Sequence, residues 1–383
     1  LEMYNCSIKK INVLLLIYLF INSLFIIKYT PNFEIFILII YNLLIFNLLC
    51  FYDKINLNEK IFAFLFFMFI IVFFLFTIYL NYSVDGNTLN VDRWSALENG
   101  AKALINGDYP YNFLSHMQHK SSNLPMLMIL GLPFYLIFGS VGYLQSFCFL
   151  LFAFLIYKMF KSYKERLLIL LLIVLSPSYV YEVYTKSDMM SNFIILLLGM
   201  YLILRNLEQK SAKKIIILGL FSSMLFLTRI SSVIPLLLVL FYPFISFSLK
   251  NKLIFIISSL TTSIIILYIG FHNANNFSEI VKNNPFTVQA TRQPLYITLS
   301  FVILTVLLSF RIKAKSQYYS FSGFLLFMMI FIFFIISLLN YGLQNVISNS
   351  YFDISYFNMC MPFVIVSIGL MFFNNKRLKL WSL

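Results

Sequence analysis

Long uninterrupted apolar runs are the feature of this 383-residue chain that most restricts its fold. A helix needs about 20 apolar residues to cross the hydrocarbon core of a bilayer. Only helices and closed barrels satisfy their backbone hydrogen bonds there. The runs in this chain are continuous, whereas the strands of a barrel alternate between apolar and polar residues. The sequence therefore predicts an all-α, polytopic membrane protein.

The composition favours the same class. Hydrophobic residues make up 61% of the chain and charged residues only 11%, against about 25% charged residues in a typical soluble domain. The net charge of +14 would favour a nucleic-acid partner in a soluble protein. In a membrane protein, Lys and Arg collect in the cytoplasmic loops instead. We therefore expect membrane lipids, and no nucleic acid, among the partners.

The chain is expected to form one integral membrane domain, residues 1–383, with twelve spans, a half-helix and an amphipathic interfacial helix. Residues 1–81 hold the first spans, residues 82–141 an outer loop with both special segments, and residues 142–383 the remaining spans. The expected spans are Ile11–Ile27, Glu34–Tyr52, Ile61–Asn81, Gly142–Phe160, Leu167–Tyr184, Met189–Ile203, Ile215–Leu227, Ser232–Ser248, Leu253–Phe271, Leu295–Phe310, Phe321–Asn340 and Phe357–Phe373.

The segment Leu124–Phe138 decides the orientation of everything that follows it. It is apolar but short, and it contains Pro125 and Pro133. If it does not cross, most of the 28 Lys and Arg residues share one side, which is then cytoplasmic. We therefore expect a re-entrant half-helix, cytoplasmic termini and an outer loop at Tyr82–Asn123, in a bacterial inner membrane.

Within the outer loop, Val91–Asn106 has the pattern of an amphipathic helix. Apolar residues such as Trp94 and Leu97 fall on one helical stripe. A helix of this kind is expected to lie in the interface plane with its apolar face in lipid. Gly107 is well placed to end it.

Asp92, at the start of this helix, is the strongest candidate for chemistry. A carboxylate at headgroup depth can act as a general base on an acceptor hydroxyl. The alternative is that Asp92 or Asn90 caps the helix. Asp85 is a candidate for substrate binding, although Asp85-Gly86-Asn87 is more typical of a turn.

Further candidates lie at the ends of the expected spans. Asp188 precedes the span that begins at Met189, where it could instead cap the helix. Arg229 ends a span and would suit a phosphate through charge-assisted hydrogen bonds. The alternative for Arg229 is snorkelling to the lipid headgroups.

His116 and His119 lie three residues apart in the outer loop and are followed by Lys120. This spacing could hold a metal, but no further ligand completes the set, and an ordinary loop is the alternative. A divalent cation therefore remains an open question. The sequence also lacks a phosphate-binding glycine loop, a zinc-protease motif and a hydrolase nucleophile elbow.

Several short motifs recur in the order and spacing of a known family. They are Asp92-Arg93-Trp94, Asn106-Gly107-Asp108-Tyr109, Asn123-Leu124-Pro125-Met126, Leu136-Ile137-Phe138-Gly139, Ser176-Pro177, Thr185-Lys186-Ser187-Asp188 and Gly219 with Leu227-Thr228-Arg229. Over Val91–Pro243 this succession resembles the GT-C glycosyltransferases, which include protein O-mannosyltransferases and lipid A aminoarabinose transferases. Asn123-Leu124-Pro125 departs from the Lys-Pro-Pro or Tyr-Pro-Pro of many members, and Arg93 stands where an acidic residue often follows the catalytic Asp.

The resemblance implies transfer of a sugar from a polyprenyl-phosphate donor to a lipid- or polymer-linked acceptor on the outer face, in one inverting displacement. It implies Asp92 as the base and Asp188 as a second carboxylate. Cations would neutralise the leaving phosphate. The residues expected to bind substrate or phosphate are Lys120, Lys186, Arg229, Arg292, Asp85, His116 and His119.

Two other functions remain open from the sequence. A polysaccharide polymerase of the O-antigen type also has many spans, but it would rely on arginines in two large outer loops, and only one large loop is expected here. A lipid-linked-sugar flippase or transporter would show internal repeats and charges in mid-helix. In this chain the charges cluster at the ends of the expected spans.

Overall fold

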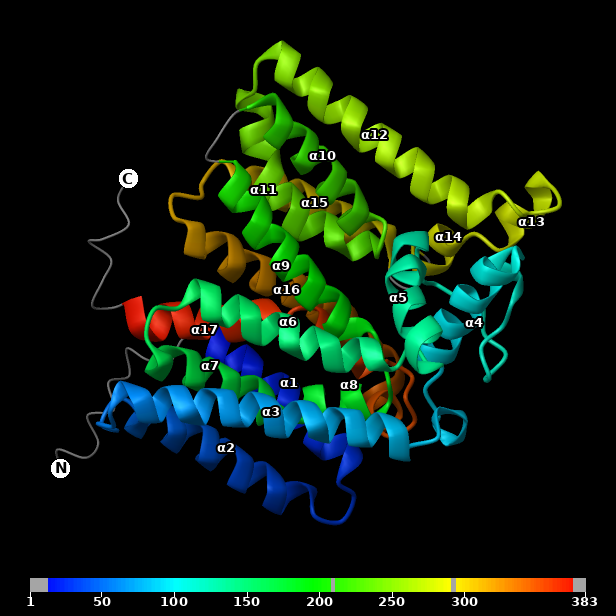
Figure 1. Ribbon diagram of the computed structural model, residues 1–383. Helices are drawn as coiled ribbons and strands as arrows, with labels where there is room; N and C mark the ends of the chain where they lie inside the picture. Colours follow the sequence, from blue (N-terminus) through cyan, green and yellow to red (C-terminus); the bar gives the residue numbers. More distant parts are fainter. Residues whose placement is uncertain (1–12, 208–210, 291–293, 375–383) are drawn as a thin grey trace. The chain divides into compact units, whose positions relative to one another are not determined.

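The computed structural model describes residues 13–207, 211–290 and 294–374. Helices account for 80% of the described residues, which contain no strand. The α-helices are α1 Val13–Tyr29, α2 Glu34–Tyr52, α3 Glu59–Ser83, α4 Arg93–Asn106, α5 Pro125–Phe138, α6 Tyr143–Met159, α7 Tyr163–Val174, α8 Pro177–Tyr184, α9 Met189–Asn206, α10 Ala212–Phe226, α11 Val233–Ser246, α12 Leu249–Phe271, α13 Phe277–Lys282, α14 Pro285–Ala290, α15 Leu295–Ser309, α16 Lys315–Ile347 and α17 Met361–Asn374 (Figure 1). Short 3-10 helices are η3 Gly86–Thr88, η4 Pro110–Asn112, η5 Ile230–Ser232 and η6 Ile354–Met359.

Several of these helices have the length and composition of membrane spans. Among the described residues, five helices meet both criteria, and up to eight do if each bent pair forms one span. The most apolar stretches of α3 and α12 are only 22% and 17% buried, so most of their apolar side chains face outward. A soluble protein rarely exposes apolar surface on this scale. The predicted class, a helical membrane protein, is confirmed at this level, while the count of twelve spans is not.

The expected span Leu167–Tyr184 is wrong as a continuous helix. It is a bent pair, α7 and α8, with an angle of 59° between them. The break comes at Ser176, directly before Pro177. Proline disfavours the helical conformation of the residue before it and has no N–H to donate to the preceding turn.

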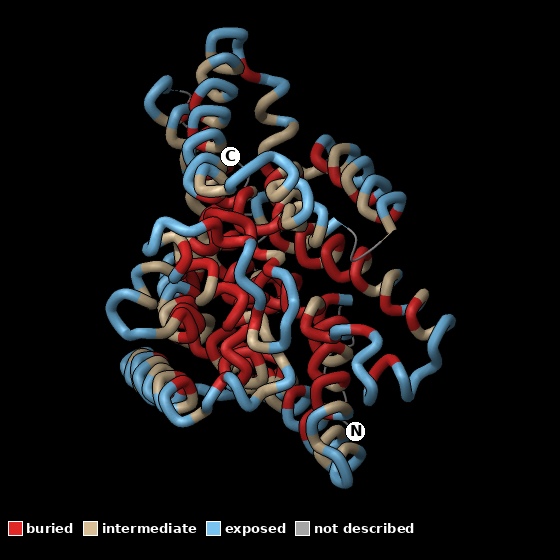
Figure 2. The backbone as a smooth tube through the Cα atoms, turned by 90° about the vertical axis from the view of Figure 1, so that its right-hand side faces the viewer, coloured by how far each residue is buried: buried red, intermediate tan, exposed pale blue. Residues whose placement is uncertain are grey.

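The described residues form two compact units. The first comprises the described parts of Leu1–Phe76, Phe152–Glu182 and Tyr319–Leu383. Its core includes an aromatic cluster in which the ring of Phe20 lies 5.5–6.2 Å from those of Phe327, Phe331, Phe334 and Phe357. The first nine residues of α17 are all buried, which places this stretch inside the unit. Figure 2 colours the backbone by burial, from buried in red to exposed in pale blue.

The second unit comprises Thr77–Leu151 and Val183–Tyr318 and contains every described candidate residue. In this unit α10 packs along α12, α11 packs on α15, and α5 contacts both α4 and α12 (Figure 1). α9 lies deep in the packing, with 67% of its apolar window buried. The prediction of a single domain remains a prediction.

The predicted amphipathic helix is α4, and most of its apolar face lies against protein where lipid was expected. Trp94, Leu97 and Ala101 are buried because α4 packs on α5, whereas Ile105 is 45% exposed. Amphipathicity shows that one face avoids water, but lipid and protein satisfy such a face equally well. The helix begins at Arg93 and ends where Gly107 adopts a left-handed conformation, as predicted.

Gly107 provides a test of this helix end. Its φ is +77°, and a Cβ there would meet no atom within 4 Å, so only backbone strain opposes a side chain. We expect Gly107→Ala to destabilise the protein by about 1 kcal/mol. Gly107→Asn should cost less, because Asn tolerates the left-handed region. Thermal unfolding of purified protein measures both, and equal stability of the Ala variant and the wild type would contradict the assignment.

Candidate functional site

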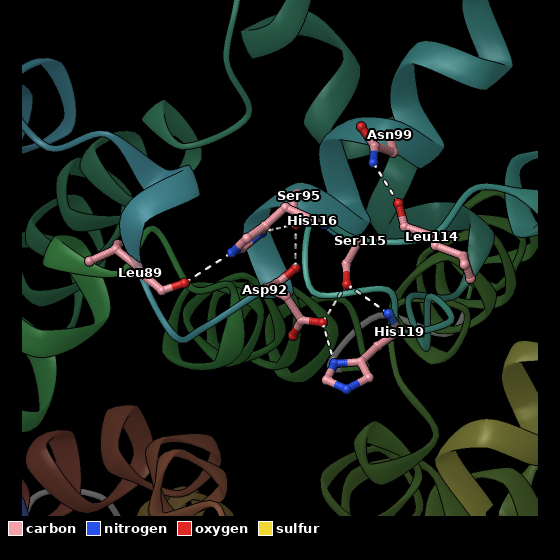
Figure 3. A network of polar contacts seen from close by, with 8 residues as sticks. All are labelled: Leu89, Asp92, Ser95, Asn99, Leu114, Ser115, His116 and His119. Carbon is pink, nitrogen blue, oxygen red and sulfur yellow. Dashed lines mark hydrogen bonds and ion pairs between the residues drawn. The ribbon is translucent and has the colours of Figure 1, made fainter.

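The loop Leu114–Lys120, here called the histidine loop, is closed on itself and fastened to α4. Leu114 and Lys120 form an isolated bridge, and Ser115 N donates to His119 O at 2.9 Å. Two further bonds tie the loop to α4: Asn99 Nδ2 donates to Leu114 O at 2.8 Å, and the backbone N of His116 donates to Ser95 Oγ at 3.2 Å. These contacts hold both histidines against the start of α4 (Figure 3).

Asp92 occupies the N-cap position of α4, but its side chain makes no capping bond. Its Oδ2 instead accepts from Ser115 Oγ at 2.5 Å and lies 2.8 Å from His119 Nδ1 (Figure 3). The capping interpretation of the sequence is therefore wrong. The carboxylate is committed to the histidine loop and is still 22% exposed.

These contacts keep Asp92 ionised. Partial burial raises the pKa of the carboxyl, but the hydrogen bonds from Ser115 and His119 outweigh burial, and the pKa lies below its usual value. Asp92 therefore carries a negative charge at neutral pH and accepts hydrogen bonds without donating any.

His116 serves to hold the loop. Its Nδ1 lies 2.7 Å from Ser95 Oγ, and its Nε2 lies 2.9 Å from the carbonyl oxygen of Leu89. Both ring nitrogens are thus occupied by protein groups. This arrangement does not support a role for His116 in binding phosphate or metal.

Asp188 and Arg229 form a buried ion pair. Arg229 Nη2 donates to Asp188 Oδ2 at 2.5 Å, and the side chains are 5% and 0% exposed respectively. The same nitrogen lies 3.4 Å from Asn123 Oδ1. Asp188 makes no side-chain cap on α9, and Arg229 does not reach outward as a snorkelling side chain would. Both structural alternatives considered for these residues are therefore wrong.

Several polar atoms in and beside this ion pair are buried and have no hydrogen-bond partner in the described part of the chain. They include Asp188 Oδ1, Arg229 Nε, Ser187 Oγ and both side-chain polar atoms of Asn192. Asp188 and Asn192 lie on one face at the start of α9, four residues apart. Each such atom costs roughly 1–3 kcal/mol when unsatisfied. A polar ligand at this end of α9 would find both donors and acceptors.

The contacts above define two clusters, the Asp92 cluster (Asp92, Ser115 and His119) and the Asp188 cluster (Asp188, Arg229 and Asn123). Lys186 precedes Asp188 by two residues and contacts α4. Its Nζ is 5.7 Å from the centre of the Trp94 ring, within cation–π range. Burial lowers the pKa of Lys186, opposed by the charges of Glu98 and Asp85. Its backbone φ is +54°, which is unusual outside glycine and costs energy. The Trp94 ring in turn packs against Gly86, where a Cβ would approach it to 2.4 Å.

The remaining candidates are not brought to these clusters. Asp85 Oδ1 accepts from the N and Nδ2 of Asn87, which confirms the turn interpretation. Lys120 is exposed, and its Nζ donates to Lys282 O at 3.0 Å. Arg292 lies outside the described residues.

The Asp92 and Asp188 clusters lie near each other because the short segment from His119 to Asn123 contributes one residue to each. His119 belongs to the Asp92 cluster and Asn123 to the Asp188 cluster, and four residues of chain span at most about 14 Å. Tyr111 fixes this segment by donating from its hydroxyl to Asn123 O at 3.1 Å. Gln289 also donates to the carbonyl of Ser122.

The sequence did not identify two partners that define the clusters, Ser115 and Asn123. The signal for Ser115 was its place directly before the two histidines, and Asn123 stood in a motif without an assigned role. Among the described residues, no group of three or more His, Cys, Asp or Glu side chains could hold a metal. Comparison of the chain with models of known families, with curated proteins and with solved structures found no match.

The buried pair predicts strong coupling between its two side chains. Arg229→Met should destabilise the protein by about 3–5 kcal/mol, because it leaves the Asp188 carboxylate buried and unpaired. The double variant Arg229→Met, Asp188→Leu should recover most of this loss. A thermal-unfolding double-mutant cycle measures the coupling, and strictly additive effects would show that the two side chains do not interact.

The lowered pKa of Asp92 predicts an acid-dependent stability. Its hydrogen bonds contribute fully above the ordinary aspartate pKa of about 3.9, and this contribution is lost as the pH falls through the lower folded value. Between about pH 5 and pH 2 the wild type should therefore lose Tm more steeply than Asp92→Asn. Parallel curves for the two proteins would mean that the carboxylate makes no stabilising contact.

Proposed function

We propose that the chain is a membrane glycosyltransferase of the GT-C type, which moves a sugar from a polyprenyl-phosphate donor to an acceptor hydroxyl on the non-cytoplasmic face. The observation that carries this proposal is the Asp92 cluster. The ionised carboxylate of Asp92 lies at the start of α4 but makes no capping hydrogen bond, and it contacts the exposed imidazole of His119. Such a group can take a proton from an incoming hydroxyl.

The proposed topology places this cluster at the outer surface. α5 has 14 residues, about 21 Å at ~1.5 Å per residue, which is less than the ~30 Å of a bilayer core. It meets α6 at 111°. This geometry supports the re-entrant interpretation. The proposed twelve spans, cytoplasmic termini and outward-facing histidine loop, in a bacterial inner membrane, depend on that interpretation together with the distribution of Lys and Arg.

The Asp188 cluster is suited to the phosphate side of the reaction. Transfer turns a phosphodiester into a phosphate monoester and so adds one negative charge to the leaving lipid. Arg229 is fixed by Asp188 through one nitrogen, and its Nε makes no other bond in the described structure. Arg229, with Lys186 two residues before its partner Asp188, can stabilise the negative charge that develops on the departing phosphate oxygen. Asp188 then acts by orienting Arg229.

The direct test uses purified protein and a panel of polyprenyl-phosphate sugars with candidate acceptors, scored by release of polyprenyl phosphate. We expect release from at least one donor, and a fall of at least ~100-fold in kcat for Asp92→Asn. Lys102→Gln is the control, because Lys102 lies exposed in the same outer loop, belongs to none of the motifs that carry the resemblance, and should retain activity.

Two outcomes would contradict the proposal. One is wild-type activity in Asp92→Asn, which would remove the proposed role of the cluster. The other is movement of the intact lipid-linked sugar across vesicles without release of polyprenyl phosphate, which would identify a flippase.

A further inference from the structure

The Asp92–His119 pair fixes where the imidazole proton lies. Oδ2 of Asp92 is 2.8 Å from Nδ1 of His119. Since the carboxylate is ionised, it accepts, and Nδ1 of His119 must carry the proton. In a neutral imidazole the second nitrogen, Nε2, then has a free lone pair.

The Asp92 carboxylate and the His119 imidazole differ in how accessible they are to a substrate hydroxyl. Oδ2 of Asp92 already receives hydrogen bonds from Ser115 and His119, and the Asp92 side chain is 22% exposed. The His119 side chain is 61% exposed. In Figure 3 its far nitrogen points away from Asp92, and Nε2 has no hydrogen-bond partner among the described residues. A base must approach to about 2.6–3.2 Å of the group it deprotonates. Oδ1 of Asp92 also has no side-chain partner among the described residues, but the His119 ring that carries Nε2 is much the more exposed of the two side chains.

The electrostatics favour the same atom. The hydrogen bonds that stabilise the Asp92 anion weaken its carboxylate as a base. The same anion stabilises the positive charge that an imidazole gains when it takes a proton. A carboxylate behind an exposed imidazole therefore promotes proton uptake at Nε2 more than at its own oxygens.

We propose that His119 is the catalytic base of the sugar transfer and that Asp92 is the positioning residue that holds its ring and tautomer; this rests on the function proposed above. The acceptor hydroxyl oxygen bonds to the anomeric carbon of the donor, and the bond from that carbon to the phosphate oxygen breaks. The hydroxyl proton moves to Nε2, and the electron pair of the broken bond leaves with polyprenyl phosphate. The imidazolium remains beside the Asp92 carboxylate.

The tautomer can be measured without any substrate. The chain has only three histidines, so ¹⁵N-histidine labelling gives few signals, which His119→Gln and His272→Gln assign. We expect neutral His119 with its proton on Nδ1 in the wild type, and loss of this preference in Asp92→Leu. A proton on Nε2 in the wild type, or no change in Asp92→Leu, would overturn the proposal.

Activity supplies the second measurement. We expect His119→Ala to lower kcat at least ~100-fold with little change in KM, and added imidazole to restore part of the rate at this exposed position. His272→Ala is the control, because the His272 ring stacks on Tyr268 and bonds its carbonyl oxygen, and its rate should be that of the wild type.

The two proposals fail in different ways. Full activity in His119→Ala, with loss in Asp92→Asn, would make the carboxylate itself the base and overturn the present inference alone. Absence of polyprenyl-phosphate release by the wild type would overturn the glycosyltransferase function together with the assignment of His119 as its base.

Discussion

One carboxylate oxygen, Oδ2 of Asp92, joins the histidine loop to the start of α4. It receives the Ser115 hydroxyl and contacts the His119 ring, and so draws the histidine loop onto the start of α4. The same loop continues to Asn123, which contacts Arg229. If this oxygen capped its own helix instead, the loop would keep its bonds from Asn99 and His116, but the His119 imidazole would lose the contact that fixes its tautomer. The local helix end has given up about 1 kcal/mol of capping energy to make the cluster possible.

Asp188, like Asp92, makes no capping hydrogen bond to its helix and instead contacts a distant side chain, here the buried guanidinium of Arg229. Burying two charges is costly even when they are paired, and an apolar pair of similar volume often gives equal or higher stability. The side chains here are almost fully buried, and several polar atoms beside them have no partner in the described part of the chain. Such an arrangement is poorly explained by stability. It fits the proposed function, which needs a fixed guanidinium beside the phosphate of the lipid donor.

The sequence predicted the helices well and the partnerships between residues poorly. Continuous apolar runs identify helices such as α2, because the signal lies within the segment itself. The contacts of Asp92 with His119, 27 residues away, and of Asp188 with Arg229, 41 residues away, depend on how loops fold back, which no local pattern records. The buried face of α4 was misassigned to lipid for a related reason. Apolar periodicity reveals that a face is covered, but not whether protein or lipid covers it.

The proposed function requires that the histidine loop, with Asp92 behind it, faces the non-cytoplasmic side. A cysteine at Met117, a loop residue that is 37% exposed, tests this most directly when labelled with a membrane-impermeant maleimide. Lys250→Cys, expected at the cytoplasmic surface, is the reference. We predict that the reagent labels position 117, and not position 250, in cells whose outer face alone is accessible. Labelling of position 117 only from the cytoplasmic side would contradict it.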